Sequence, residues 1–158
     1  MIHSSVEHAG SDSEAARRPS WSASSPAASD MLFLDLLGRY RSQGGLASLK
    51  RVETLLQGRA QALAEWIANG ELFWLAWRGE AWLPLFQLQS ATRGGPVPRA
   101  DVRSLATELR CVCDELDLCI WFVKPNGWLD GRTPVQMIDA NAENVRAAAR
   151  ADRFVMGG

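Results

Sequence analysis

The change of hydrophobic period at Asn69-Gly70 limits what this 158-residue chain can fold into more than any other feature of the sequence. Before it, apolar residues recur every three or four positions, as on amphipathic helices. These helices are predicted over residues 30–40, 48–56 and 59–68. After it, residues 71–88 alternate about Arg78-Gly79, a pair suited to a tight hairpin turn. The sequence therefore predicts helices followed by one β-hairpin.

Centring the hairpin on Arg78-Gly79 determines its register. The centring pairs Trp77 with Glu80, Leu75 with Trp82 and Phe73 with Pro84. Because proline has no N–H to donate, we expect this strand to lie at a sheet edge or to end near Pro84. Both faces carry large apolar residues, so one face should pack on the helices and the other on the C-terminal half or on a partner.

Caps and prolines indicate the helices that follow. Residues 101–118 carry an apolar stripe at helical spacing, which predicts one long helix. A further helical stretch should end near Val123, because a residue that precedes a proline avoids the α region. Thr133, Pro134 and Gln136 then form a helix start with a capping box.

The two ends of the chain differ from its middle. Residues 1–29 are rich in Ser, Ala and Pro and predict a disordered tail, because such a segment buries too little surface to offset its ordering entropy. The first helix is therefore expected to begin at Asp30. A last helix should follow Asn141, with residues 153–158 as a tail.

Together these patterns predict a mainly α-helical protein with one β-hairpin and no strand between Asp101 and Val123. A disordered tail (1–29) precedes a helical segment with a winged-helix-like hairpin (30–90) and a small C-terminal helical module (100–158). The order helix, break, helix, hairpin is that of a degenerate winged helix-turn-helix.

Composition and charge exclude several classes of protein. The net charge is −1 and the pI is about 6.1, so the whole chain is not a basic nucleic-acid binder. No apolar run approaches the ~20 residues of a membrane helix, and the first residues lack the pattern of a signal peptide. We therefore expect a protein of the bacterial cytoplasm that does not contact a membrane.

No residue pattern indicates catalysis, a cofactor or a metal site. Cys111, Cys113 and Cys119 fall within predicted helix, while both histidines lie in the N-terminal tail. Zinc prefers four N or S ligands, and a thiol nucleophile needs a base beside it. We therefore expect structural thiols, no cofactor and a protein that is not an enzyme.

The stretch "WFVKPNGWLDGRTPVQMID", residues 121–139, places two turns and several large apolar residues in a short space. We expect Pro125-Asn126-Gly127 to turn the chain and Leu129 to insert as a plug. Gly131 should reverse the chain at positive φ, which glycine adopts without steric cost. The stretch thus predicts a compact helical platform rather than an active site.

This stretch and the hairpin resemble parts of Xre/MbcA/ParS-like antitoxins. "ELFWLAWRGEAWLPLFQLQ" is similar to their hairpin with a G…P-x-F-Q signature, and "CIWFVKPNGWLDGRTPVQMIDANAENVRAAARA" is similar to their C-terminal module. The resemblance covers about residues 46–152. The matching positions of the module are Trp121, Phe122, Pro125, Asn126, Leu129, Gly131 and Pro134 and, more loosely, Val145, Ala148 and Ala149.

The resemblance implies a function. In such antitoxins the C-terminal module grips a RES-domain toxin that consumes NAD, and blocks its active site. Tryptophan and arginine are the residue types most enriched at interface hot spots. The surface expected to contact the toxin comprises Trp128, Arg132, Arg146, Arg150, Arg153, Phe154, Val155 and Met156.

In the same family an upstream helix-turn-helix commonly binds the DNA of the operon. Here the would-be recognition helix, "RAQALAEWIAN", is mostly Ala and carries Glu65, whereas major-groove readers expose Arg, Lys, Asn or Gln. Candidates for DNA contacts are Lys50, Arg51, Arg59 and Gln61. We therefore expect weak DNA binding. A winged-helix regulator acting on its own operon, and an orphan domain that has lost both partners, stay open as alternatives, as does a homodimer.

Overall fold

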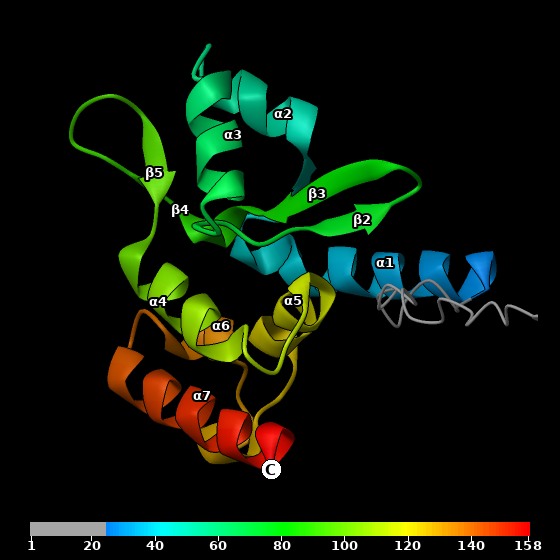
Figure 1. Ribbon diagram of the computed structural model, residues 1–158, viewed down its shortest axis with the longest axis vertical. Helices are drawn as coiled ribbons and strands as arrows, with labels where there is room; N and C mark the ends of the chain where they lie inside the picture. Colours follow the sequence, from blue (N-terminus) through cyan, green and yellow to red (C-terminus); the bar gives the residue numbers. More distant parts are fainter. Residues whose placement is uncertain (1–24) are drawn as a thin grey trace, which may run out of the picture.

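The structure, a computed structural model, describes residues 25–158 (Figure 1). Its α-helices are α1 (Pro26–Tyr40), α2 (Leu49–Leu55), α3 (Ala60–Ala68), α4 (Ala100–Leu109), α5 (Glu115–Val123), α6 (Pro134–Met137) and α7 (Ala142–Gly157). Its strands are β1 (Leu46–Ser48), β2 (Leu75–Trp77), β3 (Glu80–Pro84), β4 (Leu88–Ser90) and β5 (Pro96–Pro98). Short 3-10 helices span Arg41–Gln43, Leu85–Gln87 and Gly127–Leu129. The described chain is thus mainly helical with small antiparallel sheets.

α1 begins earlier than the sequence predicts. Ser25 caps it, since its hydroxyl accepts a hydrogen bond from Ala28 N at 3.3 Å, and Pro26 lies in the first turn. The predicted start at Asp30 is therefore wrong, because residues 25–29 form the cap and first turn of this helix. The rest of the predicted disordered tail, up to residue 24, lies outside the described residues.

The first sheet has the strand order β1-β3-β2, all antiparallel. The predicted pairs Trp77–Glu80 and Leu75–Trp82 of β2 and β3 are confirmed. Arg78 and Gly79 between these strands both have positive φ, as a type I′ turn requires. The predicted pair Phe73–Pro84 is wrong, because β2 begins only at Leu75. On the other side of β3, Pro84 lies opposite Leu46 of β1. β3 is thus the central strand, and Pro84 is its last residue.

β4 and β5 form a second antiparallel pair, so the expectation of a single hairpin is wrong. Leu88 lies opposite Pro98 in this ladder, and the connecting loop contains Gly94-Gly95, both at positive φ. Pro96 and Pro98 flank Val97, and prolines at this density argue against a strand. The pairing forms nevertheless because it is a two-stranded ribbon with free edges, where a missing N–H donor is tolerated.

The single long helix predicted over residues 101–118 is also wrong, because α4 and α5 are separate helices. Asp114 starts the second one. Its side chain accepts from Asp117 N at 2.8 Å, and Asp117 accepts in return from Asp114 N at 3.2 Å. This reciprocal capping box satisfies two donors at the start of α5. α5 ends at Val123 as predicted, and the segment from Asp101 to Val123 contains no strand.

The last two helices begin where their caps predict. At α6, Gln136 Oε1 accepts a hydrogen bond from Thr133 N at 3.2 Å. At α7, the Asn141 side chain accepts from Asn144 N at 3.1 Å. α7 then continues to Gly157, so the predicted tail is wrong and the last residues form helical turns instead.

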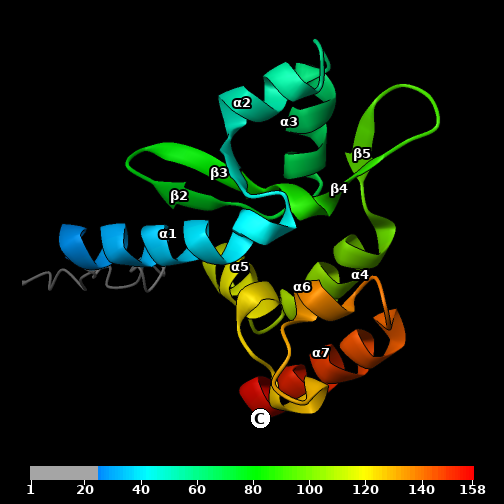
Figure 2. The same cartoon turned by 180° about the vertical axis from the view of Figure 1, so that it is seen from behind.

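Two groups of buried apolar side chains make up the core. The larger lies among α1, the sheet and α4 to α7, and includes Phe33, Leu36, Tyr40, Phe73, Leu105, Leu109, Phe122 and Val145. The smaller lies between α2, α3 and the first sheet, and consists of Ala47, Val52, Leu56, Leu63, Leu72 and Leu83. Figures 1 and 2 show the outcome: α2 and α3 lie at one end of the molecule, α7 lies at the other, and the sheet lies between.

A buried amide takes the place of a missing strand pair next to the hairpin. Gln87 is 1 % exposed. Its Nε2 donates to Phe73 O at 2.8 Å, and its Oε1 accepts from Phe73 N at 2.8 Å. Nε2 also donates to Pro84 O at 3.1 Å. The side chain therefore pairs the main chain where β2 has not yet begun, which explains why Phe73 and Pro84 need not face each other.

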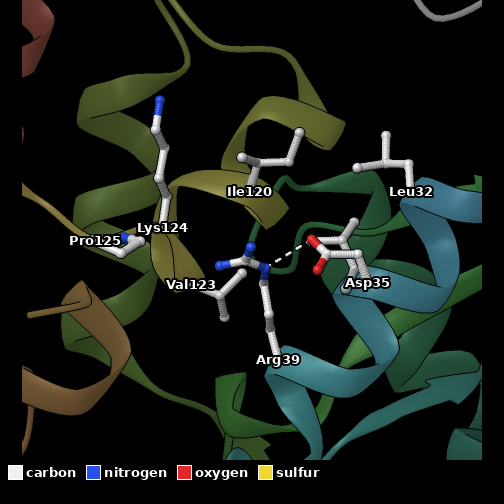
Figure 3. A pocket seen from close by; sticks show the side chains of 8 residues that line it. Leu32, Asp35, Arg39, Ile120, Val123, Lys124 and Pro125 are labelled. Carbon is white, nitrogen blue, oxygen red and sulfur yellow. Dashed lines mark hydrogen bonds and ion pairs between the residues drawn. The ribbon is translucent and has the colours of Figure 1, made fainter.

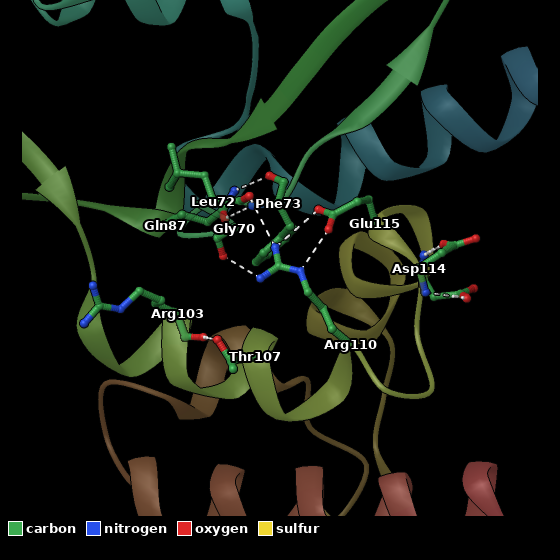
Figure 4. A network of polar contacts seen from close by, with 10 residues as sticks. Gly70, Leu72, Phe73, Gln87, Arg103, Thr107, Arg110, Asp114 and Glu115 are labelled. Carbon is green, nitrogen blue, oxygen red and sulfur yellow. Dashed lines mark hydrogen bonds and ion pairs between the residues drawn. The ribbon is translucent and has the colours of Figure 1, made fainter. Parts of the chain in front are cut away.

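A guanidinium ties the end of α3 to the start of α5 (Figure 4). Arg110 donates to Gly70 O and, at 3.3 Å, to Leu72 O. Its Nε donates to Glu115 Oε1 at 2.9 Å. Nearby, Arg103 pairs with Glu71 at 3.0 Å. These contacts hold the segment between α3 and the hairpin against the C-terminal helices.

The tip of the hairpin rests on α1. The carboxylate of Asp30 accepts from Trp77 Nε1 at 2.8 Å and from Arg78 Nη2 at 2.8 Å. The hydrogen bond from Arg78 is the main cause that lowers the pKa of Asp30. Phe33 stacks on Trp77 with ring centroids 4.0 Å apart. The hairpin is therefore held along its length rather than projecting freely.

Replacing Gln87 should show how much the buried amide contributes. Gln87→Leu keeps an apolar side chain of similar length but leaves the N–H and C=O of Phe73 buried without partners. We expect a loss of about 2–4 kcal/mol in the free energy of unfolding, measured by urea denaturation. Gln89→Leu, at an exposed position of β4, is the matched control and should change stability by no more than about 0.5 kcal/mol. Equal effects of the two substitutions would contradict the assigned role.

Candidate functional site

The corner between α5 and α6 is organised by Asn126. Its side-chain oxygen accepts from Trp128 N at 2.9 Å, and its backbone oxygen accepts from Gly131 N at 3.0 Å. Gly131 has a φ of 77°, as predicted, and Asp130 before it also has a positive φ, 55°. Leu129 is buried, so the predicted plug is confirmed. The corner closes on itself and leaves Trp128 on its outer surface.

One carboxylate, that of Asp152 near the end of α7, accepts three hydrogen bonds from this region. Its Oδ2 accepts from Asn126 Nδ2 at 2.7 Å and from Trp121 Nε1 at 2.8 Å. Its Oδ1 accepts from Trp128 Nε1 at 3.0 Å. Asp152 therefore joins α5, the corner and α7, and it orients both tryptophan side chains.

Trp128 is 62 % exposed although its N–H is bound. One edge of the indole is held by Asp152 while much of the ring faces solvent. A side chain that is already oriented loses less conformational entropy when a partner covers it. The position thus has the properties of a preorganised contact residue.

Asp152 is the site residue that sequence reasoning missed. A signal for it exists, because Val145, Ala149, Asp152 and Met156 recur at spacings of four, three and four along α7. The apolar members at 145 and 149 are buried. A carboxylate on the buried stripe of a helix needs a polar partner inside the fold. The sequence does not say which residues provide it.

A groove of about 290 Å³ lies beside Trp128. It is lined by Trp121, Lys124, Pro125, Asn126, Gly127, Trp128, Asp152 and Met156. Of the residues predicted to contact a partner, Trp128 and Met156 line this groove, and Arg132 does not. Arg132 instead donates to Met137 Sδ at 3.5 Å.

The last turns of α7 expose three large apolar side chains, which we call the apolar end of α7. Phe154 is 82 % exposed, Val155 69 % and Met156 50 %. They belong to a helix and not to the predicted tail, so they are presented on a regular backbone. The apolar end of α7 begins two residues after Asp152, and Met156 also lines the groove.

Three arginines of the predicted contact surface recur at spacings of four and three on α7, and this basic stripe is largely paired. Arg146 and Arg150 contact Glu143 at 2.9 and 3.5 Å, and Arg153 contacts Glu108 at 3.6 Å. All of these arginines stay well exposed, so the pairs are weak in water. The stripe is a mixed-charge surface and not an open positive one.

The predicted DNA-contact residues lie at the opposite end of the molecule, on or beside α2 and α3 (Figure 1). Lys50 and Arg51 are exposed on α2. Arg59 donates to Pro96 O at 3.0 Å and lies over the Trp66 ring at 5.3 Å. Gln61 donates to a glutamate on the next turn at 3.1 Å. Two of the four candidates, Arg59 and Gln61, are therefore hydrogen-bonded within the chain.

Two of the three cysteines have the environments of structural thiols, whereas Cys111 is exposed. Cys113 and Cys119 are buried, and burial raises the pKa of Cys113 to about 11 and that of Cys119 well above its ordinary value. Protonated thiols are poor nucleophiles and poor metal ligands. Within residues 25–158 no group of three His, Cys, Asp or Glu is placed to hold a metal ion. In the same part of the chain, no helix has the length and apolar character needed to cross a membrane.

A second hollow, of about 370 Å³, lies between α1 and α5 (Figure 3). Its apolar wall includes Leu36, Ile120 and Val123. Asp35 and Arg39 lie one turn apart on α1, on the same side of the hollow, and pair at 2.7 Å. Because these charges satisfy each other, the hollow lacks a group comparable with Asp152.

No family model, curated protein or solved structure gives a significant match to this chain. A function must therefore be argued from the groove beside Trp128, the apolar end of α7, and the arrangement of α2, α3 and the hairpin. The first two are adjacent, and they form the surface with the largest exposed aromatic side chains of the described chain.

Removing the Asp152 carboxylate should loosen this site. Asp152→Ala leaves Asn126 and Trp121 without an acceptor near the core, so we expect a loss of about 2–4 kcal/mol in unfolding free energy. The indole N–H resonances of Trp121 and Trp128 should shift in NMR spectra. Glu143→Ala on the same helix is the control and should cost no more than about 1 kcal/mol. Unchanged indole resonances in the Asp152 variant would refute this geometry.

Proposed function

We propose that this protein is a non-enzymatic, antitoxin-like protein of the bacterial cytoplasm. In this proposal its C-terminal module binds and neutralises a RES-type toxin that consumes NAD. The observation that carries the proposal is that Asp152 holds the exposed ring of Trp128 beside the exposed apolar end of α7. Trp128 and Asp152 lie in the segment whose sequence resembles Xre/MbcA/ParS-like antitoxins, and the apolar end of α7 comes just after that segment.

Most of the residues that carry the resemblance form the interior of the module, and the candidate contact residues form its surface. Trp121, Phe122, Leu129 and Pro134 are buried, and Asn126 organises the corner. They build the frame of the module, and of these Trp121 and Asn126 also line the groove beside Trp128. The candidate contact residues lie outside the frame, on its surface. Such a module keeps its shape while its outer residues adapt to one toxin.

The exposed surface has the chemistry of a protein interface. Large apolar side chains gathered on a soluble domain mark interaction sites, and tryptophan is enriched among hot-spot residues. Trp128 donates to Asp152, and Phe154 and Met156 lie two and four residues after Asp152 on α7, so all three provide such side chains close to it. The surrounding arginines supply the polar rim that protein interfaces commonly have. In the proposed complex the apolar end of α7 covers the toxin's active-site mouth and excludes NAD.

The order of elements favours a second candidate function. α1, β1, α2, α3, β2 and β3 follow one another, and β1 joins the hairpin in one sheet. This order supports a winged helix-turn-helix, with α3 as the recognition helix of a transcriptional regulator that acts on its own operon.

Local contacts argue that any such DNA binding is weak. The exposed face of α3 offers alanines, with Gln61 bonded to Glu65. Arg59 is engaged with Pro96, and Arg78 at the hairpin tip is bound to Asp30. Phosphate contacts depend on available positive charge, which these pairings reduce. We therefore place toxin binding first and DNA binding second.

Neutralisation of a RES-type toxin encoded beside this protein tests the first function. Trp128→Ala and deletion of residues 154–158 should each weaken binding of the toxin at least about tenfold, measured by calorimetry, and should restore its NAD-consuming activity. Both variants should unfold within about 1 kcal/mol of the parent, because the removed side chains are exposed.

Met31→Ala is the matched control, since Met31 is an equally exposed apolar residue on α1. It should leave toxin binding unchanged. The proposal fails if the truncated protein folds and still inhibits the toxin as the parent does. It also fails if the parent protein does not bind the toxin.

A mobility-shift titration with the promoter region of its own operon tests the second function. We expect a dissociation constant no tighter than about 1 µM at physiological salt, with little difference from unrelated duplexes. Glu65→Gln should strengthen binding only modestly, because it removes one negative charge from α3. Nanomolar affinity for one operator sequence would overturn this ranking.

A further inference from the structure

The negative charge of Asp152 has no cationic partner among the described residues. Its three hydrogen bonds come from neutral donors, namely two indoles and one amide. No Lys or Arg of residues 25–158 lies within ion-pair distance of it. By contrast, Glu143, the other acidic residue of α7, pairs with Arg146, and Asp35 in the hollow between α1 and α5 pairs with Arg39.

The carboxylate also has an acceptor position left. An ionised carboxylate offers about four lone-pair sites to donors. Oδ2 of Asp152 accepts two hydrogen bonds and Oδ1 accepts one. The remaining site is therefore on Oδ1, the oxygen next to the Trp128 indole. Asp152 itself lines the groove beside Trp128, so a ligand in the groove can reach this oxygen.

The walls of the groove suit a flat cation. Trp121, Trp128, Pro125 and Met156 surround the carboxylate. A cation over an indole ring is attracted by its π-electrons, and a guanidinium stacks on such a ring while its N–H groups reach a carboxylate. Lys124 also lines the groove, but it makes no ion pair with Asp152.

We propose that the groove beside Trp128 binds an arginine side chain of the partner protein, which stacks on Trp128 and donates to Asp152 Oδ1. This inference rests on the proposed function for the identity of the partner. The chemistry of the groove is independent of the proposed function. Charge complementarity favours arginine over an apolar side chain, because an apolar group would bury the carboxylate without a cation.

A titration with N-acetyl-arginine amide tests the site without the partner. In NMR spectra of the full chain, the indole N–H signals of Trp128 and Trp121 should shift and saturate, with a dissociation constant on the order of 1–10 mM. The matched probe N-acetyl-citrulline amide has nearly the same shape without the charge, and it should bind at least about fivefold more weakly. Asp152→Asn, which keeps an oxygen acceptor, should weaken arginine binding by about the same factor.

Each outcome decides the proposal. Equal binding of the arginine and citrulline probes, or no saturable shift of the Trp128 signal, overturns it. Shifts that appear only when the protein itself is concentrated, without a probe, mean that an arginine of a second copy occupies the groove, which also overturns it. If the arginine probe binds but a RES-type toxin does not, the site stands and the proposed function fails. If the toxin binds while the arginine probe does not, this inference fails alone.

Discussion

The carboxylate of Asp152 is the contact on which the C-terminal module depends. It accepts hydrogen bonds from α5, from the corner after α5, and from Trp128. Trp121 and Asn126 are both nearly buried, so their N–H groups need an acceptor within the protein. The same hydrogen bonds that satisfy them also determine where Trp128 points. Stability of the module and presentation of its exposed tryptophan are therefore coupled through one side chain.

Polar side chains also connect this module to the N-terminal half. Gln87 bonds the main chain of Phe73, and Arg110 bonds the carbonyls of Gly70 and Leu72. Both therefore act on the short segment that links α3 to the hairpin. With Asp30 bound to the hairpin tip, that segment and the hairpin are held at both ends. A hairpin held in this way has less freedom to follow a DNA backbone, which agrees with ranking DNA binding second.

Two hollows of the described surface differ in whether their acidic side chain has a cationic partner. The hollow between α1 and α5 contains an ion pair whose members neutralise each other. The groove beside Trp128 contains a carboxylate that neutral donors hold in place without neutralising it. Protein partners recognise such groups because a buried charge is favourable only when it is paired on binding. The apolar end of α7 adds hydrophobic surface beside it, so apolar burial and charge pairing are available to one partner.

Several structural features that depend only on neighbouring residues were predictable from the sequence. The stop at Asn69-Gly70, the turn at Arg78-Gly79 and the left-handed Gly131 depend on a few adjacent backbone angles. The start of α1 and the break before α5 are equally local, yet they were missed. Ser25 and Asp114 are polar residues in polar surroundings, and many such residues cap no helix.

Only the tertiary structure decided the rest. Which strands meet determines that Pro84 pairs with β1 and that β4 pairs with β5. Both pairings involve prolines, which a sequence pattern counts against a strand. The role of Asp152 depends on residues 24 to 31 positions away in the chain. The amphipathic stripe of α7 determined that its apolar face would be buried, but not what it would meet. Hydrogen bonds between distant segments form only after the hydrophobic core has brought those segments together. The sequence alone therefore indicated most of the helices and the first hairpin, whereas the packing of α7 against α4 and against the Gly127–Leu129 turn created the site.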